Sequence, residues 1–112
     1  MRRSSDAFLP LTHVVYHVLL SLATRSSHGY GIIKDVEERT QGRLVLEAGT
    51  LYAAIKRLRD DGLIQDGAAP KDADARRRYY ALTPLGRDVL TAESERLEEL
   101  VELARGARVL PA

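Results

Sequence analysis

The chain has 112 residues, of which 45% are hydrophobic and 29% charged, and its 17 lysines and arginines against 16 aspartates and glutamates give a formal net charge of +1. A chain of this length buries a single core, which excludes a catalytic domain joined to a regulatory one, and the composition excludes collagen-like and wholly disordered proteins. The absence of cysteine excludes disulfides, thiolate metal sites and cysteine nucleophiles. Near-neutral charge argues against a protein that coats nucleic acid by bulk electrostatics, but local basic patches remain open.

Polar residues interrupt the apolar stretch near the amino terminus. Pro10, Thr12, His13 and His17 fall inside it, and its unbroken apolar runs are short, as at residues 18–20. A membrane-spanning helix needs roughly 20 consecutive apolar residues. The sequence therefore predicts a cytoplasmic protein with no membrane partner.

Residues 9–24 are predicted to form the first helix, because apolar side chains recur there at helical spacing. Its apolar face comprises Leu11, Val14, Val15, Val18, Leu19 and Leu22. Ser26 or Ser27 caps a second helix that begins at His28 or Gly29 and is closed by Gly42. The expected inward face of this second helix comprises Tyr30, Ile33, Val36 and, at its edge, Thr40.

The next segments change from helical to strand-like patterns. Residues 43–46 are a candidate short strand, and residues 48–61 are a third helix that stops at Gly62 in a left-handed conformation. The buried stripe of this helix comprises Leu51, Ile55 and Leu58. Residues 63–65 and 76–82 then form two strands, with the intervening residues as a long hairpin loop.

The last predicted helix opens with Thr83 and Pro84, a cap followed by a proline, and runs to about Arg105. Its glutamates are expected on a solvated face, at positions 93, 95, 98, 99 and 102. An apolar stripe on a solitary helix needs a cover, and the expected cover is the same helix of a second chain. The expected dimer interface comprises Val15, Leu19, Leu90, Leu97, Leu100, Val101 and Ala104.

Three helices followed by a two-stranded wing are typical of the winged helix-turn-helix arrangement. The predicted fold class is therefore mainly α with a small β-wing. Residues 1–82 are expected to form the winged helix-turn-helix domain, in which the order of residues 1–8 is left open. Residues 83–112 are expected to form a long carboxy-terminal dimerisation helix and a tail.

The outward face of the third helix combines the features that entry into a major groove requires. Gly49 and Ala53 are small enough for close approach, Thr50 supplies a hydroxyl near the amino-terminal end, and Lys56 and Arg57 supply long positive donors. The alternative is an ordinary solvated face, which most lysine-arginine pairs on helices form.

The wing strengthens the nucleic-acid interpretation, because Arg76, Arg77 and Arg78 lie beside the hairpin and are suited to bind phosphate or the minor groove. The alternative is that these arginines pair with carboxylates, for which the candidates are Asp60, Asp61 and Asp66. Lys71 at the loop tip lies close to two aspartates, at positions 72 and 74, so the tip is expected to stay outside the groove.

Several motifs together resemble the PadR family of bacterial transcriptional regulators, in matching order over residues 28–90. They are HGYGII at residues 28–33, GTLY at 49–52, KRL at 56–58, DGLI at 61–64, RRRYYALT at 76–83 and Gly86. The resemblance implies a winged-helix repressor that acts as a homodimer on operator DNA, with the carboxy-terminal helix making the dimer in the short form of the family.

The resemblance also implies roles for individual residues. The recognition role falls to Thr50, Tyr52, Lys56 and Arg57, and the backbone role falls to the wing arginines. Tyr30 is expected near DNA phosphate. Ala48 departs from the family pattern, where many members have proline, and the acidic wing tip is a second departure.

Members of the family commonly respond to small aromatic compounds, so a small hydrophobic effector is left open. The chain has no tryptophan and one phenylalanine. Flat ligands usually require aromatic walls. A pocket would therefore need aliphatic walls. The candidate lining residues are Leu97, Leu100, Val15 and Leu19.

Enzyme function is not expected. HGYG at residues 28–31 resembles an oxyanion-hole segment, but no Gly-x-Ser-x-Gly motif accompanies it. His13 and His17 have metal-binding spacing without an evident third ligand, so neither a metal nor another cofactor is expected. The remaining alternative is a winged-helix protein-docking module without DNA binding, in which the basic residues of the third helix and wing are dispensable.

The net charge divides unevenly along the chain. Residues 1–87 carry +4 and residues 88–112 carry −3. Binding to DNA is therefore expected to be salt-sensitive and to depend on dimerisation, with few phosphate contacts for each subunit.

Overall fold

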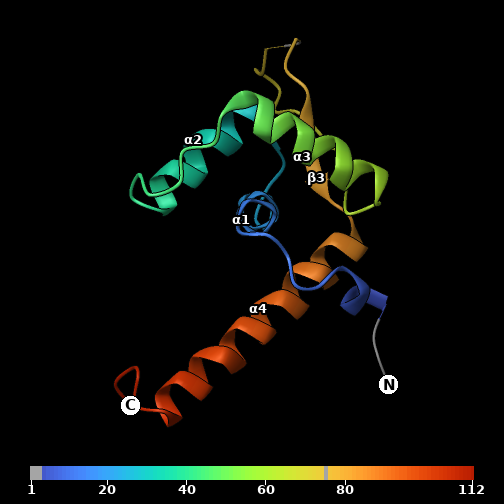
Figure 1. Cartoon of the computed structure of the whole chain (residues 1–112). Coiled ribbons are helices and arrows are strands. Elements are labelled where there is room, and N and C mark those ends of the chain that lie inside the picture. Colours follow the sequence, from blue (N-terminus) through green and yellow to red (C-terminus); the bar gives the residue numbers. More distant parts are fainter. Residues whose placement is uncertain (1–3, 75) are drawn as a thin grey trace.

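The computed structural model describes residues 4–74 and 76–112. Its elements in chain order, most of them labelled in Figure 1, are η1 (Ser4–Phe8), α1 (His13–Ser21), β1 (Ser27–His28), α2 (Gly29–Arg39), α3 (Ala48–Asp60), β2 (Ile64–Asp66), β3 (Tyr79–Leu82) and α4 (Pro84–Gly106). The strands of this described part form one antiparallel sheet in the order β1-β3-β2. The predicted fold class, mainly α with a small β-wing, is confirmed.

Helix α1 begins later than the sequence predicts, at His13 instead of residue 9. The side chain of Thr12 caps it by accepting a hydrogen bond from the Val15 N–H at 3.2 Å. The residues before this cap form the short helix η1 and an irregular link. Helix α1 packs against α2, α3 and α4, and is therefore the centre of the fold.

Helix α2 is capped by His28, so the prediction of a serine cap was wrong. The Gly31 N–H donates to Nδ1 of His28 at 3.0 Å. Ser27 lies in β1 instead, paired with Tyr80 of β3, while His28 pairs with Tyr79. This third strand was absent from the prediction.

The inward face of α2 also differs from the prediction. Ile32 and Val36 are fully buried, whereas Tyr30 is 58% exposed. The helix begins at Gly29, and the register that buries Ile32 sends Tyr30 to the outside. Gly42 has a positive φ of 79°, in agreement with its predicted role as the stop.

Residues 43–46 form no strand, so that prediction was wrong. Leu46 is buried in the core while its neighbour Val45 is 58% exposed, so burial alternates as it would in a strand. Among the described residues, however, no strand pairs with this segment. The segment is an extended link to α3.

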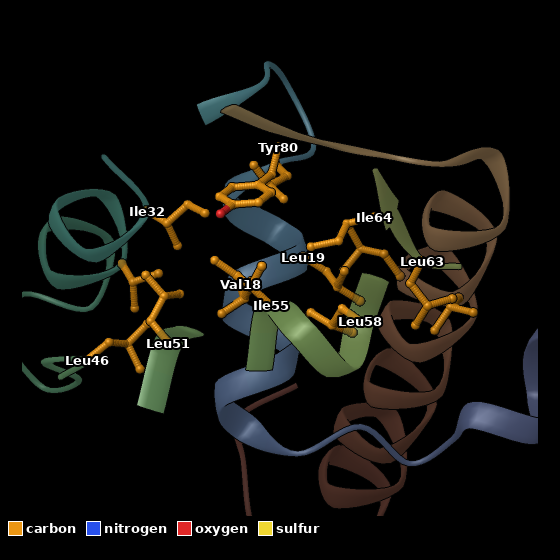
Figure 2. Packing of buried hydrophobic residues seen from close by; sticks show 14 residues of the cluster. Val18, Leu19, Ile32, Leu46, Leu51, Ile55, Leu58, Leu63, Ile64 and Tyr80 are labelled. Atoms are coloured by element: carbon orange, nitrogen blue, oxygen red, sulfur yellow. The ribbon is translucent and has the colours of Figure 1, made fainter. Parts of the chain in front are cut away.

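Helix α3 agrees with the sequence prediction to within one residue at its end. Its stripe of Leu51, Ile55 and Leu58 is buried, and Gly62 follows with a φ of 77°. Figure 2 shows this stripe in one cluster with side chains of α1, β2 and β3. Labelled members of the cluster include Val18, Leu19, Ile64 and Tyr80.

The two wing strands differ from the prediction, because β2 is shifted by one residue and β3 is shorter. Strand β3 begins at Tyr79, so Arg76, Arg77 and Arg78 precede it and were wrongly placed in the strand. The Arg77 N–H donates to the Asp74 carbonyl oxygen at 3.0 Å, which closes a turn. The alternating faces of a strand therefore do not determine where these arginines point.

Helix α4 begins at Pro84 with Thr83 as its cap, as predicted, and continues to Gly106. Its first half packs against α1 and η1, while its second half extends away from the rest of the molecule (Figure 1). Within residues 4–74 and 76–112, no helix combines the length and apolar character that a membrane crossing requires.

The packing of α4 corrects three expectations. Leu19 and Leu90 are 0% and 6% exposed inside the subunit's own core, so they are not free to form a dimer interface. Glu93 was expected on a solvated face and is only 1% exposed. Its carboxylate accepts from the Leu11 N–H at 2.7 Å and from Arg96 one turn further along, and the bond from Leu11 ties the segment before α1 to α4.

Candidate nucleic-acid interface

The outward side of α3 is open to solvent. Gly49, Thr50, Ala53 and Lys56 are all exposed, and a side chain added at Gly49 would meet open space. Nζ of Lys56 lies 2.9 Å from Oδ2 of Asp60, but the two side chains are 79% and 66% exposed. Because pairs this exposed contribute little, Lys56 can exchange Asp60 for another anion.

The two basic residues predicted together on α3 lie on different sides of its outward face. Arg57 lies beside the amino-terminal segment, where it lines a small hollow with Phe8 and Val15. Lys56 lies toward the wing, where it lines a groove of about 530 Å³ with Tyr52 and Arg78. The face of α3 therefore presents one cation on each side of the ridge formed by Gly49 and Ala53.

Tyr52 joins α3 to the beginning of α2. A side chain at Gly29 would overlap the Tyr52 hydroxyl and lie 2.9 Å from its ring carbon Cζ. The absence of a side chain at Gly29 therefore leaves room for the tyrosine ring. The residue Tyr52 is nevertheless 50% exposed to solvent. The ring fixes the position of α3 relative to the first turn of α2.

The three wing arginines are exposed, and each has a partner within the chain. Arg76 pairs with Asp74 at 3.1 Å, and Arg78 pairs with Asp66 at 3.7 Å. Asp66 also lies 3.5 Å from Arg59 of α3, so this one carboxylate joins the wing to the helix. Hydrogen bonds from Arg76 lower the pKa of Asp74. The sequence left open whether these arginines pair with Asp60, Asp61 or Asp66. Arg78 does pair with Asp66, whereas Asp60 pairs with Lys56.

Arg77 lies in a cluster of rings between the wing and α2. Its Nη1 is 2.9 Å from Nε2 of His28, and its guanidinium carbon is 5.8 Å from the centre of the Tyr30 ring. Nζ of Lys34 is 6.0 Å from the same ring centre. The His28 ring is parallel to Tyr30 and meets the edge of Tyr79 at 5.2 Å between centroids. Burial, and secondly the Arg77 charge, lower the pKa of His28.

Sequence reasoning did not assign DNA-side roles to His28, Lys34 or Arg59. His28 stood in the quoted HGYGII motif, but histidine is not among the usual helix caps. Lys34 and Arg59 lie on flanks of their helices that a simple wheel treats as solvated. Lys71, predicted at the wing, is exposed at a turn near the loop tip.

A second exposed region lies on the far half of α4. Leu100 and Val101 are 48% and 39% exposed, and Leu97 and Ala104 are half-buried, as is Val15 on α1. The prediction missed further exposed apolar side chains at this end, namely Leu103, Val109 and Leu110. The described residues hold no group of three or more histidine, cysteine, aspartate or glutamate side chains that could bind a metal ion.

Comparison with known proteins places this architecture in a family. The profile of the Transcriptional regulator PadR-like family matches residues 18–92, more than half of the chain. The protein belongs to the PadR-like family. Transcriptional regulator Rv3488 of Mycobacterium tuberculosis is 35% identical to it over 92 residues, which cover 82% of each chain. The family resemblance expected from the motifs is confirmed.

Solved structures extend the comparison. A transcriptional regulator from Clostridium thermocellum is 28% identical with a TM-score of 0.71, and the match covers 94% of this PadR-like chain and 97% of that one. Bacillus subtilis PadR in complex with operator DNA shares the fold at 22% identity and a TM-score of 0.62, over 72% of this chain and 46% of that one. Membership of a family of transcriptional regulators agrees with the expectation that the protein is not an enzyme.

Proposed function

We propose that this PadR-like regulator binds DNA through α3 and the wing. One observation carries the proposal: the exposed ridge of Gly49, Thr50 and Ala53 has cations on both sides and exposed wing arginines next to it. A ridge of small residues lets a helix approach base edges, and flanking cations bind phosphate. The operator complex of Bacillus subtilis PadR, which shares the fold, supports DNA binding by a protein of this architecture.

The proposal assigns the following roles. Gly49, Thr50, Tyr52, Ala53, Lys56 and Arg57 of α3 face the major groove. Tyr30 and the wing residues Lys71, Arg76, Arg77 and Arg78 face the backbone, with the acidic loop tip outside the groove. Arg57 differs from the others because it lies beside the amino-terminal segment of the chain.

We further propose that the regulator acts as a homodimer and as a repressor on an inverted-repeat operator. Two copies of α3 about 34 Å apart then enter successive major grooves. The apolar stripe of α4 supports the dimer, since Leu100 and Val101 are exposed and Leu97 is half-buried, which leaves them for a second copy. The pocket for a small hydrophobic effector would be lined by this same stripe and by Val15. Leu19 is enclosed within the subunit core.

Electrophoretic mobility shift against DNA from upstream of the protein's own coding region tests DNA binding. The variant Lys56→Ala with Arg57→Ala should lose at least about fivefold in affinity if either residue reads a base, since one such contact contributes about 1–3 kcal/mol. Arg108→Gly is the control, because it removes one charge at the far end of α4, where φ is 63° and suits glycine.

The alternative function, a protein-docking module, makes a different prediction. Under it, wild-type protein shows no shift at low salt, or the double variant shifts DNA as well as wild type does. Either result would replace the DNA-binding proposal with the docking one.

A further inference from the structure

The ring of His28 is held in one orientation by contacts on several sides. Its Nδ1 accepts from the Gly31 N–H at 3.0 Å, and the ring is parallel to Tyr30 and nearly perpendicular to Tyr79. A side chain at Gly31 would overlap Ser27 Oγ and press on the His28 ring at 3.3 Å. Glycine at position 31 therefore keeps the space in which the histidine caps α2, and Nε2 of the ring is left pointing to the wing.

The hydrogen on the His28 ring can be assigned from its partners. The pKa of His28 lies below its ordinary value because of burial and Arg77, so the ring is neutral at neutral pH, with one nitrogen that donates and one that accepts. Nδ1 accepts from a main-chain N–H, and this capping bond stabilises α2 more than an exposed arginine contact does. Nε2 therefore carries the hydrogen and is a donor.

Arg77 brings a second donor to the same place. Its Nη1 lies 2.9 Å from Nε2 of His28, and a guanidinium has no acceptor. Two N–H donors thus lie next to each other, one on β1 and one on the exposed wing. Lys34 adds a second positive charge on the same tyrosine ring as Arg77, and the positive end of the α2 dipole begins at Gly29 beside it.

A carboxylate close to Arg77 is engaged elsewhere. Asp74 is close enough for the charge of Arg77 to lower its pKa, but its oxygens accept from the side chain and main chain of Arg76. A negatively charged oxygen that lies against both Nε2 of His28 and Nη1 of Arg77 would satisfy both donors. Phosphate oxygens are the acceptors that pairs of this kind recognise.

We propose that His28 and Arg77 together bind one backbone phosphate of DNA, an inference that rests on the proposed function. The capping bond fixes the His28 tautomer, so the protein fold itself orients the Nε2–H donor toward the phosphate. Arg77 supplies the charge, and its place over the Tyr30 ring keeps it next to His28. The beginning of α2 and the wing thus meet on the same phosphate.

The decisive experiment is a double-mutant cycle on DNA binding, measured by fluorescence anisotropy with labelled duplex from the protein's own upstream region. His28→Asn keeps an oxygen that can cap α2, because asparagine is a favoured cap, but the side chain is too short to reach the phosphate. Arg77→Met removes the guanidinium. Each single variant should weaken binding about tenfold, as expected for a hydrogen bond to a charged group.

The two variants should not be additive. If both residues bind one phosphate, the double variant loses far less than the product of the two single losses. Arg76→Met is the matched control on the same wing, with the same charge removed and a different partner, and its effect should multiply with that of His28→Asn. Circular dichroism melts check that His28→Asn folds, and His28→Ala shows the additional cost of losing the cap.

Chemically modified DNA identifies the phosphate that the two residues bind. Replacing single phosphates of the duplex by neutral methylphosphonates should reveal one position at which both His28→Asn and Arg77→Met have lost their effect. Inorganic phosphate is the second probe: if it shifts the His28 ring signals in NMR while DNA shows no coupling between the residues, the site binds free phosphate and the assignment to DNA is overturned.

Different results would contradict DNA binding itself and the shared phosphate contact. Wild-type protein that binds no DNA at low salt overturns the proposed function and this assignment together. Wild-type binding with multiplicative losses for His28→Asn and Arg77→Met, or with an unchanged affinity for His28→Asn, overturns only the shared phosphate.

Discussion

Glu93 is a buried carboxylate whose removal should destabilise the whole fold. It is 1% exposed, accepts from the Leu11 N–H and pairs with Arg96, whose side chain is 36% exposed. Glu93→Ala leaves both donors without this acceptor. Breaking a buried pair costs 3–5 kcal/mol, and because Arg96 is partly in water we expect the low end, about 3 kcal/mol.

Glu93→Gln separates the charge from the hydrogen bond. The glutamine carbonyl oxygen can still accept from the Leu11 N–H, so this variant should lose about 1–2 kcal/mol, less than the alanine variant. Both variants are compared with wild type by urea unfolding at one fixed protein concentration, because the stability of the proposed dimer would depend on concentration.

The pH dependence gives the sign of the charge contribution. Hydrogen bonding from Arg96 is the main cause that lowers the pKa of Glu93, with the Leu11 N–H acting in the same direction against burial. A carboxyl with a lowered folded pKa stabilises the protein fully above its unfolded value of about 4.3, and the contribution is lost as pH falls through the folded value. The gap between wild type and Glu93→Gln should therefore be widest near neutral pH and narrow on acidification. A gap that stays constant as pH falls, or a Glu93→Ala loss below about 1 kcal/mol, contradicts this account.

Three further predictions concern the proposed function. Gly29→Ala should displace the Tyr52 ring and lower DNA affinity, with a cost in stability of about 1–3 kcal/mol; mobility shift and thermal melts measure the two effects, and unchanged DNA binding would separate Tyr52 from recognition. Leu97→Lys with Leu100→Lys should give monomers on a sizing column, and an unchanged dimer would mean that another surface forms the interface. Asp66→Asn should tighten DNA binding about two- to fivefold, because it frees the two arginines that this exposed carboxylate holds; Glu99→Gln on α4 is the control of equal charge, and equal gains for both variants would indicate a non-specific effect.

Local patterns were enough to predict the parts of the fold that depend on local chemistry. The boundaries of α3 and the conformation of Gly62 follow from an apolar stripe that ends in a glycine, and the start of α4 follows from Thr83 and Pro84. These signals lie within a few residues of the feature they determine. The winged-helix order could therefore be read from the chain.

The errors come from contacts between distant segments. Strand β1 has two residues and exists because β3 pairs with it, some fifty positions away, so no pattern at Ser27 and His28 announces it. The same holds for Glu93, which looks like its neighbouring glutamates until Leu11 is brought against it. Leu19 was assigned to a dimer because an apolar position does not say which surface covers it.

The candidate site was predicted in outline for the same reason. Residue types on the outward face of α3 follow from a helical wheel, so Lys56 and Arg57 were found, but the wheel gave no sign that the amino-terminal segment lies beside Arg57. The pairing of His28 with Arg77 joins residues from β1 and the wing. Such a pair becomes visible only when the sheet brings the two segments together.

The near-neutral charge of the chain acquires a specific meaning at this surface. Several cations on the proposed DNA face already have a carboxylate partner, and the pairs are Lys56 with Asp60, Arg59 and Arg78 with Asp66, and Arg76 with Asp74. Binding DNA then exchanges exposed carboxylates for phosphates, so each cation contributes less than a free one. With a net charge of only +4 on residues 1–87, one subunit gains little from this exchange. A second subunit doubles the number of exchanges on one duplex, and this is the physical reason to expect that dimerisation, more than the strength of any single contact, sets the affinity.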